Sequence, residues 1–375
     1  MKLKTNICEL LGIDYPIVLG GMGGAGTPAL AAAVSKAGGL GVLGAADCGA
    51  VELRENIAEV RRLTDKPFGV NTLLPASVRR QARQADGERA PTLEERLAAH
   101  HKFAREFMER EGLCEPTVEQ HEALQGLGRP HRKGHIPFTQ EFFEEQMEVI
   151  VEERVPVYAS GLGSPDRWMD RLHANGTKVM ALIGNPTQAK RLVDSGLDVV
   201  IAQGSDAGGH NSGIGTLSLV PQVVDAVGGI PVLAAGGIAD GRGVAAVLML
   251  GAQGAWIGSA FLASHEANIL DFQKQAIIEG TAESSTVSLS WTGKPARVLR
   301  SKWTEAWAAA ELEPLPMPYQ QMISWPVMAA ALLAGRRDIV PGTAGQGIGL
   351  VREIRPAGEI VASLVTGAET ALLVK

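Results

Sequence analysis

Short apolar runs alternate along the chain with longer segments in which apolar residues recur at helical spacing. Eight of the runs have the length and composition of buried strands, at residues 17–22, 40–45, 68–74, 155–160, 178–183, 199–203, 232–236 and 255–258. Helix-like segments lie between most of them, at residues 27–37, 52–63, 139–153, 165–174, 186–195, 217–227 and 243–250. Helix-start signals such as Asn185-Pro186, and glycines after helix ends such as Gly196, support these boundaries.

The alternation predicts an α/β fold in which eight parallel strands close into a (β/α)8 TIM barrel. Eight strand–helix units in roughly 260 residues match the size of such a barrel. An open, doubly wound sheet is the alternative, but the pattern contains no long surplus of edge strands. We therefore expect residues 1–265 to form the barrel. Apolar residues make up 45% of the chain and aromatic residues only 5%, which suits small and branched side chains packed between sheet and helices.

The connection after the third strand is much longer than the others. Residues 139–153 resemble its crossover helix, which leaves residues 79–137 as an insertion with a helix-like run at 92–111. Loops that follow barrel strands lie on the catalytic face, so we expect the insertion to cover or rim the active site. A helical hairpin at the periphery is the alternative.

The strand pattern stops after Ala263. Helix-like segments follow at residues 268–279, 303–311 and 317–335. We expect residues 266–340 to form a helical cap region, and residues 341–375 to be a C-terminal segment that packs back on the barrel.

The net charge of −6 argues against a partner held through nucleic-acid phosphates. No stretch of about 18 apolar residues is present, and the first residues lack the apolar core of a signal peptide. These observations predict a cytoplasmic protein with no membrane partner. They leave the oligomeric state open, a homodimer included.

The cysteines and histidines do not suggest a metal site. Cys8, Cys48 and Cys114 are too few and too widely spaced for a disulfide framework or a zinc site. The insertion contains His100, His101, His121, His131 and His135. Because no pair of them has close helical spacing with carboxylate support, we expect no metal there.

Glycine-rich turns follow the last two predicted strands. Gly236 and Gly237 end one strand directly before a helix, and Trp256-Ile257-Gly258-Ser259 ends the next. Backbone amides at such turns can approach a phosphate closely, and barrels commonly bind phosphate at the loops after strands seven and eight. These segments therefore predict a phosphate cradle. In the alternative interpretation the glycines only permit tight turns.

The segment that follows the sixth strand joins glycines to polar side chains. Gln203 ends the strand, and Gly208, Gly209 and His210 follow it. The glycines would let a flat ring lie against the backbone, and the Gln203 amide could bond either edge of that ring. An imidazole can take up a proton, or hold an anion as its cation, near neutral pH. A surface histidine after a flexible loop is the alternative.

Two further positions could contact a ring. Gly20-Gly21 at the end of the first strand permits close approach, and Met22 offers a polarizable face. Asn71 lies inside an apolar strand, where an unpaired amide would be costly, so either a ligand or a structural hydrogen bond must satisfy it. A core methionine is the alternative for Met22.

Together these segments resemble the nitronate monooxygenase family, formerly called 2-nitropropane dioxygenases. They also resemble its relatives, the flavin-dependent enoyl-ACP reductases and NADH:quinone reductases. The resemblance runs from Ile13 to Leu350 without the insertion. It rests on residues 66–71 (KPFGVN), 208–210 (GGH), 235–241 (AGGIADG) and 258–259 (GS), and on 293–297 (GKPAR), which resembles a family motif in the helical part.

The resemblance implies bound FMN and a catalytic role for His210. Met22 and Asn71 would contact the flavin ring from one side, and Gln203 and Gly208 from the other. The cofactor-binding set is then Gly21, Met22, Asn71, Gln203, Gly208, Gly209, Gly236, Gly237, Trp256, Ile257, Gly258 and Ser259. Gly20-Gly21 stands where nitronate-oxidizing members more often have Ala-Pro, and Ser259 stands where threonine is common but keeps the hydroxyl.

The expected reaction is FMN-dependent oxidation of an alkyl nitronate, such as propionate 3-nitronate, by O₂ to a carbonyl compound and nitrite. His210 would then stabilise the anionic nitronate as an imidazolium, or deprotonate a neutral nitroalkane. The first alternative is an NAD(P)H-dependent FMN reductase of quinones or enoyl thioesters. The second is a phosphate-binding barrel without flavin.

Overall fold

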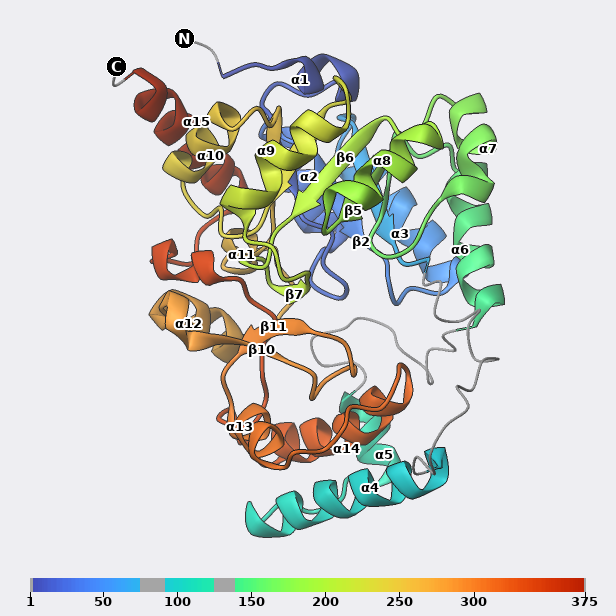
Figure 1. Cartoon of the computed structure of the whole chain (residues 1–375), viewed down its shortest axis with the longest axis vertical. Coiled ribbons are helices and arrows are strands. Elements are labelled where there is room, and N and C mark those ends of the chain that lie inside the picture. The colour runs from blue at the N-terminus through green and yellow to red at the C-terminus, as the bar shows by residue number, and fades with distance from the viewer. Residues whose placement is uncertain (1–2, 75–91, 125–138, 374–375) are drawn as a thin grey trace.

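The computed structural model of the protein describes residues 3–74, 92–124 and 139–373 (Figure 1). Eight parallel strands form one sheet in the order β1-β9-β8-β6-β5-β4-β3-β2. They are β1 (Ile17–Leu19), β2 (Gly41–Gly44), β3 (Phe68–Thr72), β4 (Val157–Ser160), β5 (Lys178–Ile183), β6 (Val199–Gln203), β8 (Val232–Ala235) and β9 (Gly254–Ile257). A parallel bridge between Val18 and Leu40 joins the two edge strands. The predicted barrel is confirmed, and each predicted run overlaps one of its strands.

Alternation along the strands separates the barrel interior from its outer face, because successive side chains of a strand point to opposite sides. Val18, Val157 and Ala159 belong to one buried cluster inside the barrel. Their neighbours Leu19 and Tyr158 belong to the larger cluster beneath the helices. Helix α1 (Asn6–Leu11), which the pattern did not predict, adds its apolar residues to the interior cluster. It closes the barrel at the end where the strands begin (Figure 1).

Helices cover the outside of the barrel as the sequence predicts. They are α2 (Pro28–Lys36), α3 (Ala50–Leu63), α6 (Gln140–Glu152), η2 (Asp166–Trp168), α7 (Met169–Ala174), α8 (Pro186–Asp194), α9 (Thr216–Ala226), α10 (Gly241–Met249) and the short α11 (Ser259–Leu262). Side chains of Thr27, Asn185 and Asp240 cap α2, α8 and α10 by accepting a backbone N–H. The last helix, α15 (Ala357–Leu373), packs on α10, where Gly241 and Gly367 allow close contact.

A small antiparallel sheet lies beyond the barrel. It contains β7 (Gly209–His210), β10 (Ser285–Ser288) and β11 (Ala296–Leu299), in the order β10-β11-β7. The prediction that strands end after Ala263 is therefore wrong. The hairpin strands are short and partly polar, and they are completed by a partner distant in sequence, so local periodicity does not reveal them.

A helical lobe lies next to this sheet, on the side where the barrel strands end (Figure 1). It contains α4 (Leu93–Arg110), α5 (Val118–Leu124), α13 (Lys302–Ala309) and α14 (Tyr319–Leu333); α12 (Asp271–Glu279), η3 (Ala282–Ser284) and η4 (Gln346–Leu350) lie nearer the barrel. Phe107 of the insertion and Trp303 share a buried cluster. The insertion's α4 thus packs on α14 within the lobe, while residues 79–91 and 125–137 lie outside the described part.

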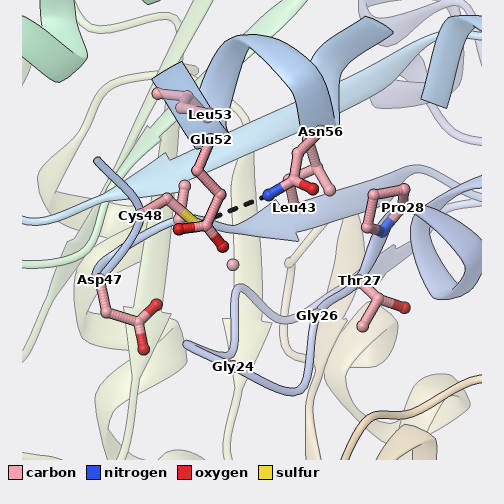
Figure 2. Close-up of a pocket in the computed structure, with 12 residues that line it drawn as sticks. Gly24, Gly26, Thr27, Pro28, Leu43, Asp47, Cys48, Glu52, Leu53 and Asn56 are labelled. Atoms are coloured by element: carbon pink, nitrogen blue, oxygen red, sulfur yellow. Dashed lines mark hydrogen bonds between the residues drawn. The ribbon is translucent and has the colours of Figure 1, made fainter. Parts of the chain in front are cut away.

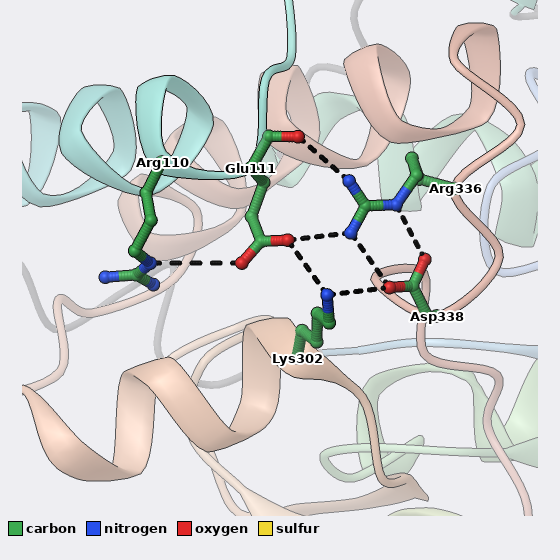
Figure 3. A network of polar contacts seen from close by, with 5 residues as sticks. All are labelled: Arg110, Glu111, Lys302, Arg336 and Asp338. Carbon is green, nitrogen blue, oxygen red and sulfur yellow. Dashed lines mark hydrogen bonds and ion pairs between the residues drawn. The ribbon is translucent and has the colours of Figure 1, made fainter.

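Ion pairs also join the insertion to the lobe (Figure 3). Glu111, just after α4, accepts from Arg336 Nη2 at 2.7 Å and from Lys302 Nζ at 3.1 Å. Asp338 pairs with the same two cations. Hydrogen bonds from Arg336 and then Lys302 lower the pKa of Glu111, so the network stays ionised at neutral pH.

Among the described helices, none combines the length and the hydrophobicity that a membrane crossing requires.

Candidate functional site

The loops after the barrel strands bring the predicted residues to one end of the barrel, because parallel strands share their carboxyl end. A side chain on Gly21 would meet the Asn71 side chain at 2.4 Å, so the first and third strands approach closely there. The sulfur of Met22 lies 3.4 Å from the position that a Cβ on Gly258 would take. Residues from β1, β3 and β9 therefore meet at the barrel mouth.

Asn71 is 5% exposed, and its Nδ2 donates to the Ala159 carbonyl oxygen at 2.9 Å. A structural hydrogen bond thus satisfies one half of the amide. The carbonyl oxygen, Oδ1, has no partner among the described residues, so it remains available to a donor on a ligand.

The turns after β8 and β9 have the features of an anion cradle. Gly236 and Gly237 have φ values of 109° and 73°, a backbone region that favours glycine. In the described part of the chain, the N–H groups of Gly237, Gly258 and Ser259 have no hydrogen-bond partner. The Ser259 hydroxyl accepts from Gly345 N at 2.8 Å, which leaves its own proton free to donate.

Trp256 and Ile257 contribute to the site differently. The Trp256 side chain lies in the barrel interior beside Gly20, and the Ile257 side chain lies in the core beneath the helices. Both residues belong to β9, whose backbone pairs with its neighbours. Trp256 and Ile257 therefore support the turn that follows β9, and the backbone amides without a hydrogen-bond partner among the described residues begin in that turn at Gly258.

Residues 343–347 form a strap across these loops. The strap's Gly345 amide bonds Ser259, and Gln346 N donates to the Asp206 carbonyl oxygen at 2.9 Å. Gly208 lies so close to the strap that a Cβ there would be 2.7 Å from the Ala344 carbonyl carbon. The strap thus joins the loop after β6 to the turn after β9, a role that the sequence did not indicate.

His210 is held by contacts from three directions. Its backbone pairs with Ala296 of β11, and its carbonyl oxygen accepts from Gln203 Nε2 at 2.5 Å. Its Nε2 lies 2.8 Å from Thr292 Oγ1. The other ring nitrogen has no partner among the described residues. The ring is therefore fixed at one nitrogen and free to bind a ligand at the other, and Gln203 keeps its side-chain oxygen free as well.

Burial lowers the pKa of His210 to about 4, and the nearby positive charge of Lys294 contributes in the same direction. The ring is therefore neutral at pH 7. This environment favours a neutral ring, whereas the sequence alone suggested an imidazolium that stabilises an anion. A neutral ring can still donate or accept a hydrogen bond, or act as a base.

We expect an NMR titration of the histidine rings to place His210 near pH 4, well below the ordinary value of about 6.5. The signal would be assigned by its loss in the His210→Asn variant. Since the folded pKa lies below the unfolded one, this group should reduce stability as the pH falls below about 6.5. A midpoint near 6.5 would contradict the burial of the ring.

The segment 293–297, which resembles a family motif, lies in and beside the small antiparallel sheet. Gly293 to Pro295 form the turn between β10 and β11, and Arg297 lies in β11. Arg297 Nε donates to the Ser205 carbonyl oxygen at 2.9 Å and so holds the loop that precedes His210. Sequence reasoning also missed Thr292, which is separated from His210 by 82 positions.

Comparison with known proteins identifies the family of this chain. The nitronate monooxygenase family profile matches residues 4–367. The chain belongs to this family. Its membership confirms the predicted resemblance, and the protein is an oxidoreductase.

Individual relatives agree with this family. A probable nitronate monooxygenase from Staphylococcus aureus is 32% identical over 373 residues, covering 96% of each chain. Nitroalkane oxidase from Streptomyces ansochromogenes is 31% identical, with a TM-score of 0.79 and 98% of each chain covered. FabK from Thermotoga maritima is also 31% identical, with a TM-score of 0.74, covering 98% of this chain and 97% of its own.

A small pocket lies between the loop after β1 and the start of α3 (Figure 2). Gly24, Thr27, Cys48, Glu52 and Asn56 are among its lining residues. None of the residues assigned to the flavin from the sequence lines it. Because its walls include carboxylates, it is poorly suited to a phosphate.

No cluster of three or more metal-binding side chains occurs among the described residues of this family member.

The cysteines should differ sharply in reactivity. Burial raises the pKa of Cys48 to about 12, and Glu52 adds to the effect, whereas Cys114 is exposed. Since only the thiolate is a strong nucleophile, iodoacetamide at pH 8 should modify Cys114 first and leave Cys48 unmodified in the folded protein. Peptide mass spectrometry over time would measure this. Faster labelling of Cys48 would show that the pocket opens in solution.

Proposed function

We propose that the protein oxidises alkyl nitronates, such as propionate 3-nitronate, with bound FMN and O₂, to a carbonyl compound and nitrite. The observation that carries the proposal is the family match over residues 4–367, which includes the barrel and most of the helical additions. The substrate is a small molecule, as the family implies.

Donors and acceptors at the barrel mouth support the proposal of bound FMN, at both its phosphate and its ring. The free amides of Gly237, Gly258 and Ser259, together with the Ser259 hydroxyl, are donors suited to a phosphate. Met22 and the free oxygens of Asn71 and Gln203 are suited to the ring and its polar edge. When bound, FMN would accept the electrons of the substrate and pass them to O₂.

His210 would act on the substrate as a neutral group. Thr292 holds one ring nitrogen, so the other can bond a nitronate oxygen or take a proton from a neutral nitroalkane. A nitronate arrives already deprotonated, so hydrogen bonding and orientation are the main contributions that it needs from this residue.

The proposal is tested by purifying the protein and supplying propionate 3-nitronate in air. We expect a yellow protein that releases FMN on denaturation and forms nitrite as O₂ is consumed. A flavin-loaded protein that forms no nitrite above the uncatalysed rate would contradict the proposal. A colourless protein without FMN would favour the flavin-free barrel.

A second candidate is an NAD(P)H-dependent FMN reductase of quinones or enoyl thioesters. It is kept because FabK matches this chain with the same identity as the nitroalkane oxidase does. Gly20-Gly21, which lacks the Ala-Pro common in nitronate-oxidizing members, is compatible with it. Rapid bleaching of the flavin by NADH without O₂ would favour this candidate.

A further inference from the structure

Lys294 lies in the turn between β10 and β11, beside the residues that hold His210. Two positions earlier, Thr292 bonds the His210 ring, and the Lys294 N–H itself donates to Thr292 Oγ1 at 3.4 Å. The carbonyl oxygen of the next residue, Pro295, accepts from Asn211 N at 3.4 Å. Hydrogen bonds on both sides of Lys294 therefore join this turn to the loop that contains His210.

The helical lobe holds the other side of this turn. Gly293 has φ 76°, and a Cβ there would lie 1.8 Å from the Leu315 carbonyl oxygen. The turn is thus clamped between the lobe and the barrel mouth. The backbone of Lys294 is therefore held in place next to the candidate site.

Lys294 is half-buried, yet its ammonium has no carboxylate or hydrogen-bond partner in the part of the chain that the structure describes. By contrast, Lys178 and Lys302 each contact a carboxylate, and Lys274 donates to backbone carbonyls. Burial lowers the pKa of Lys294, which records the cost of a charge removed from water without a counterion. A bound anion would remove that cost.

We propose that Lys294 binds the reacting anionic group of the substrate, the nitronate itself, at the mouth of the barrel. The proposal rests on the proposed function and sharpens it. Lys294 supplies the positive charge that the neutral His210 ring lacks, and an ammonium is a strong point charge for oxygen anions. Charge then comes from Lys294, and hydrogen bonding or proton transfer comes from His210.

The test compares Lys294→Met and Lys294→Arg with Lys36→Met, since Lys36 is an exposed lysine at the end of α2. We expect Lys294→Met to raise the KM for both ethylnitronate and propionate 3-nitronate by about 10- to 100-fold, the range of a hydrogen bond to a charged group. Lys294→Arg should restore part of the loss, and Lys36→Met should behave as the unmodified protein. FMN content should be equal in all of them.

Nitrite titration of the oxidised, FMN-loaded protein gives a readout without turnover. We expect the flavin spectrum to report nitrite binding whose Kd rises at least about 10-fold in Lys294→Met. An unchanged Kd would overturn the role of Lys294, even if the protein oxidises nitronates. A loss confined to propionate 3-nitronate would also overturn it, because the lysine would then bind the remote carboxylate. If no nitronate is oxidised at all, the titration still decides whether Lys294 binds an anion.

Discussion

Replacing His210 by asparagine is expected to lower kcat/KM for nitronates by about 100-fold, and more for neutral nitroalkanes, which also need a base. Thr292 fixes the imidazole at one nitrogen, and the other nitrogen is free in the described part of the chain. We therefore expect the loss of activity to come from removal of the ring and not from a change in the loop. Nitrite formation at saturating O₂ would measure the change. FMN content should stay the same, because no part of the ring contacts the proposed phosphate cradle.

A matched control is His101→Asn, which changes an exposed histidine of α4 in the helical lobe. It should leave kcat/KM unchanged. If His210→Asn also leaves nitronate turnover unchanged, with FMN still bound, the catalytic role of His210 is wrong. The barrel mouth would then need another residue for the chemistry.

Gly236→Ala is expected to remove most of the bound FMN. A Cβ at this position would lie 2.7 Å from Thr216 Oγ1 and 2.9 Å from Ala207 N, so the turn after β8 and the loop after β6 would have to separate. The residue also has φ 109°, which costs an alanine about 1–2 kcal/mol of backbone strain. FMN release and absorbance after purification would measure the occupancy.

Gly229→Ala separates backbone strain from displacement of the cradle. Gly229 has φ 100°, but nothing lies within 4 Å of the position that an added methyl group would take, and the residue precedes β8 at the opposite end of the barrel. This variant should lose some stability and keep its FMN. Equal FMN loss in both variants would show that general destabilisation, and not the turn at Gly236, determines binding.

The barrel could be predicted from the sequence because each strand is a short apolar run with a turn or helix signal on either side. The run at 199–203, for example, is buried on both faces and needs no distant information to be recognised. The hairpin of β10 and β11 could not be predicted in the same way. Its strands have four residues each, and β11 is paired with Gly209 and His210 across the molecule.

The candidate site was predictable where glycines and polar residues follow strands directly. The turn at Gly236 and the turn at Gly258 belong to this group. Thr292 and Lys294 do not, since they reach His210 only through the small sheet. Their contribution depends on tertiary packing, which cannot be inferred from the periodicity and spacing of residues in the sequence.

The charge of His210 is the point at which the structure departs most from the sequence-based interpretation. An isolated imidazole titrates near neutral pH, which made a cation plausible. Burial, together with the positive charge of Lys294, favours the neutral form instead. The pKa of a residue depends on its environment, so the residue type alone could not identify which group carries the charge.

In the proposed reaction, a nitronate reduces the bound flavin. Anaerobic stopped-flow mixing of the FMN-loaded protein with propionate 3-nitronate, NADH or NADPH tests it most directly. We predict that the nitronate bleaches the flavin at a rate sufficient for turnover, and that both nicotinamides do so much more slowly. Rapid bleaching by NADH or NADPH, with none by the nitronate, would contradict the proposed function and assign the protein to the reductases.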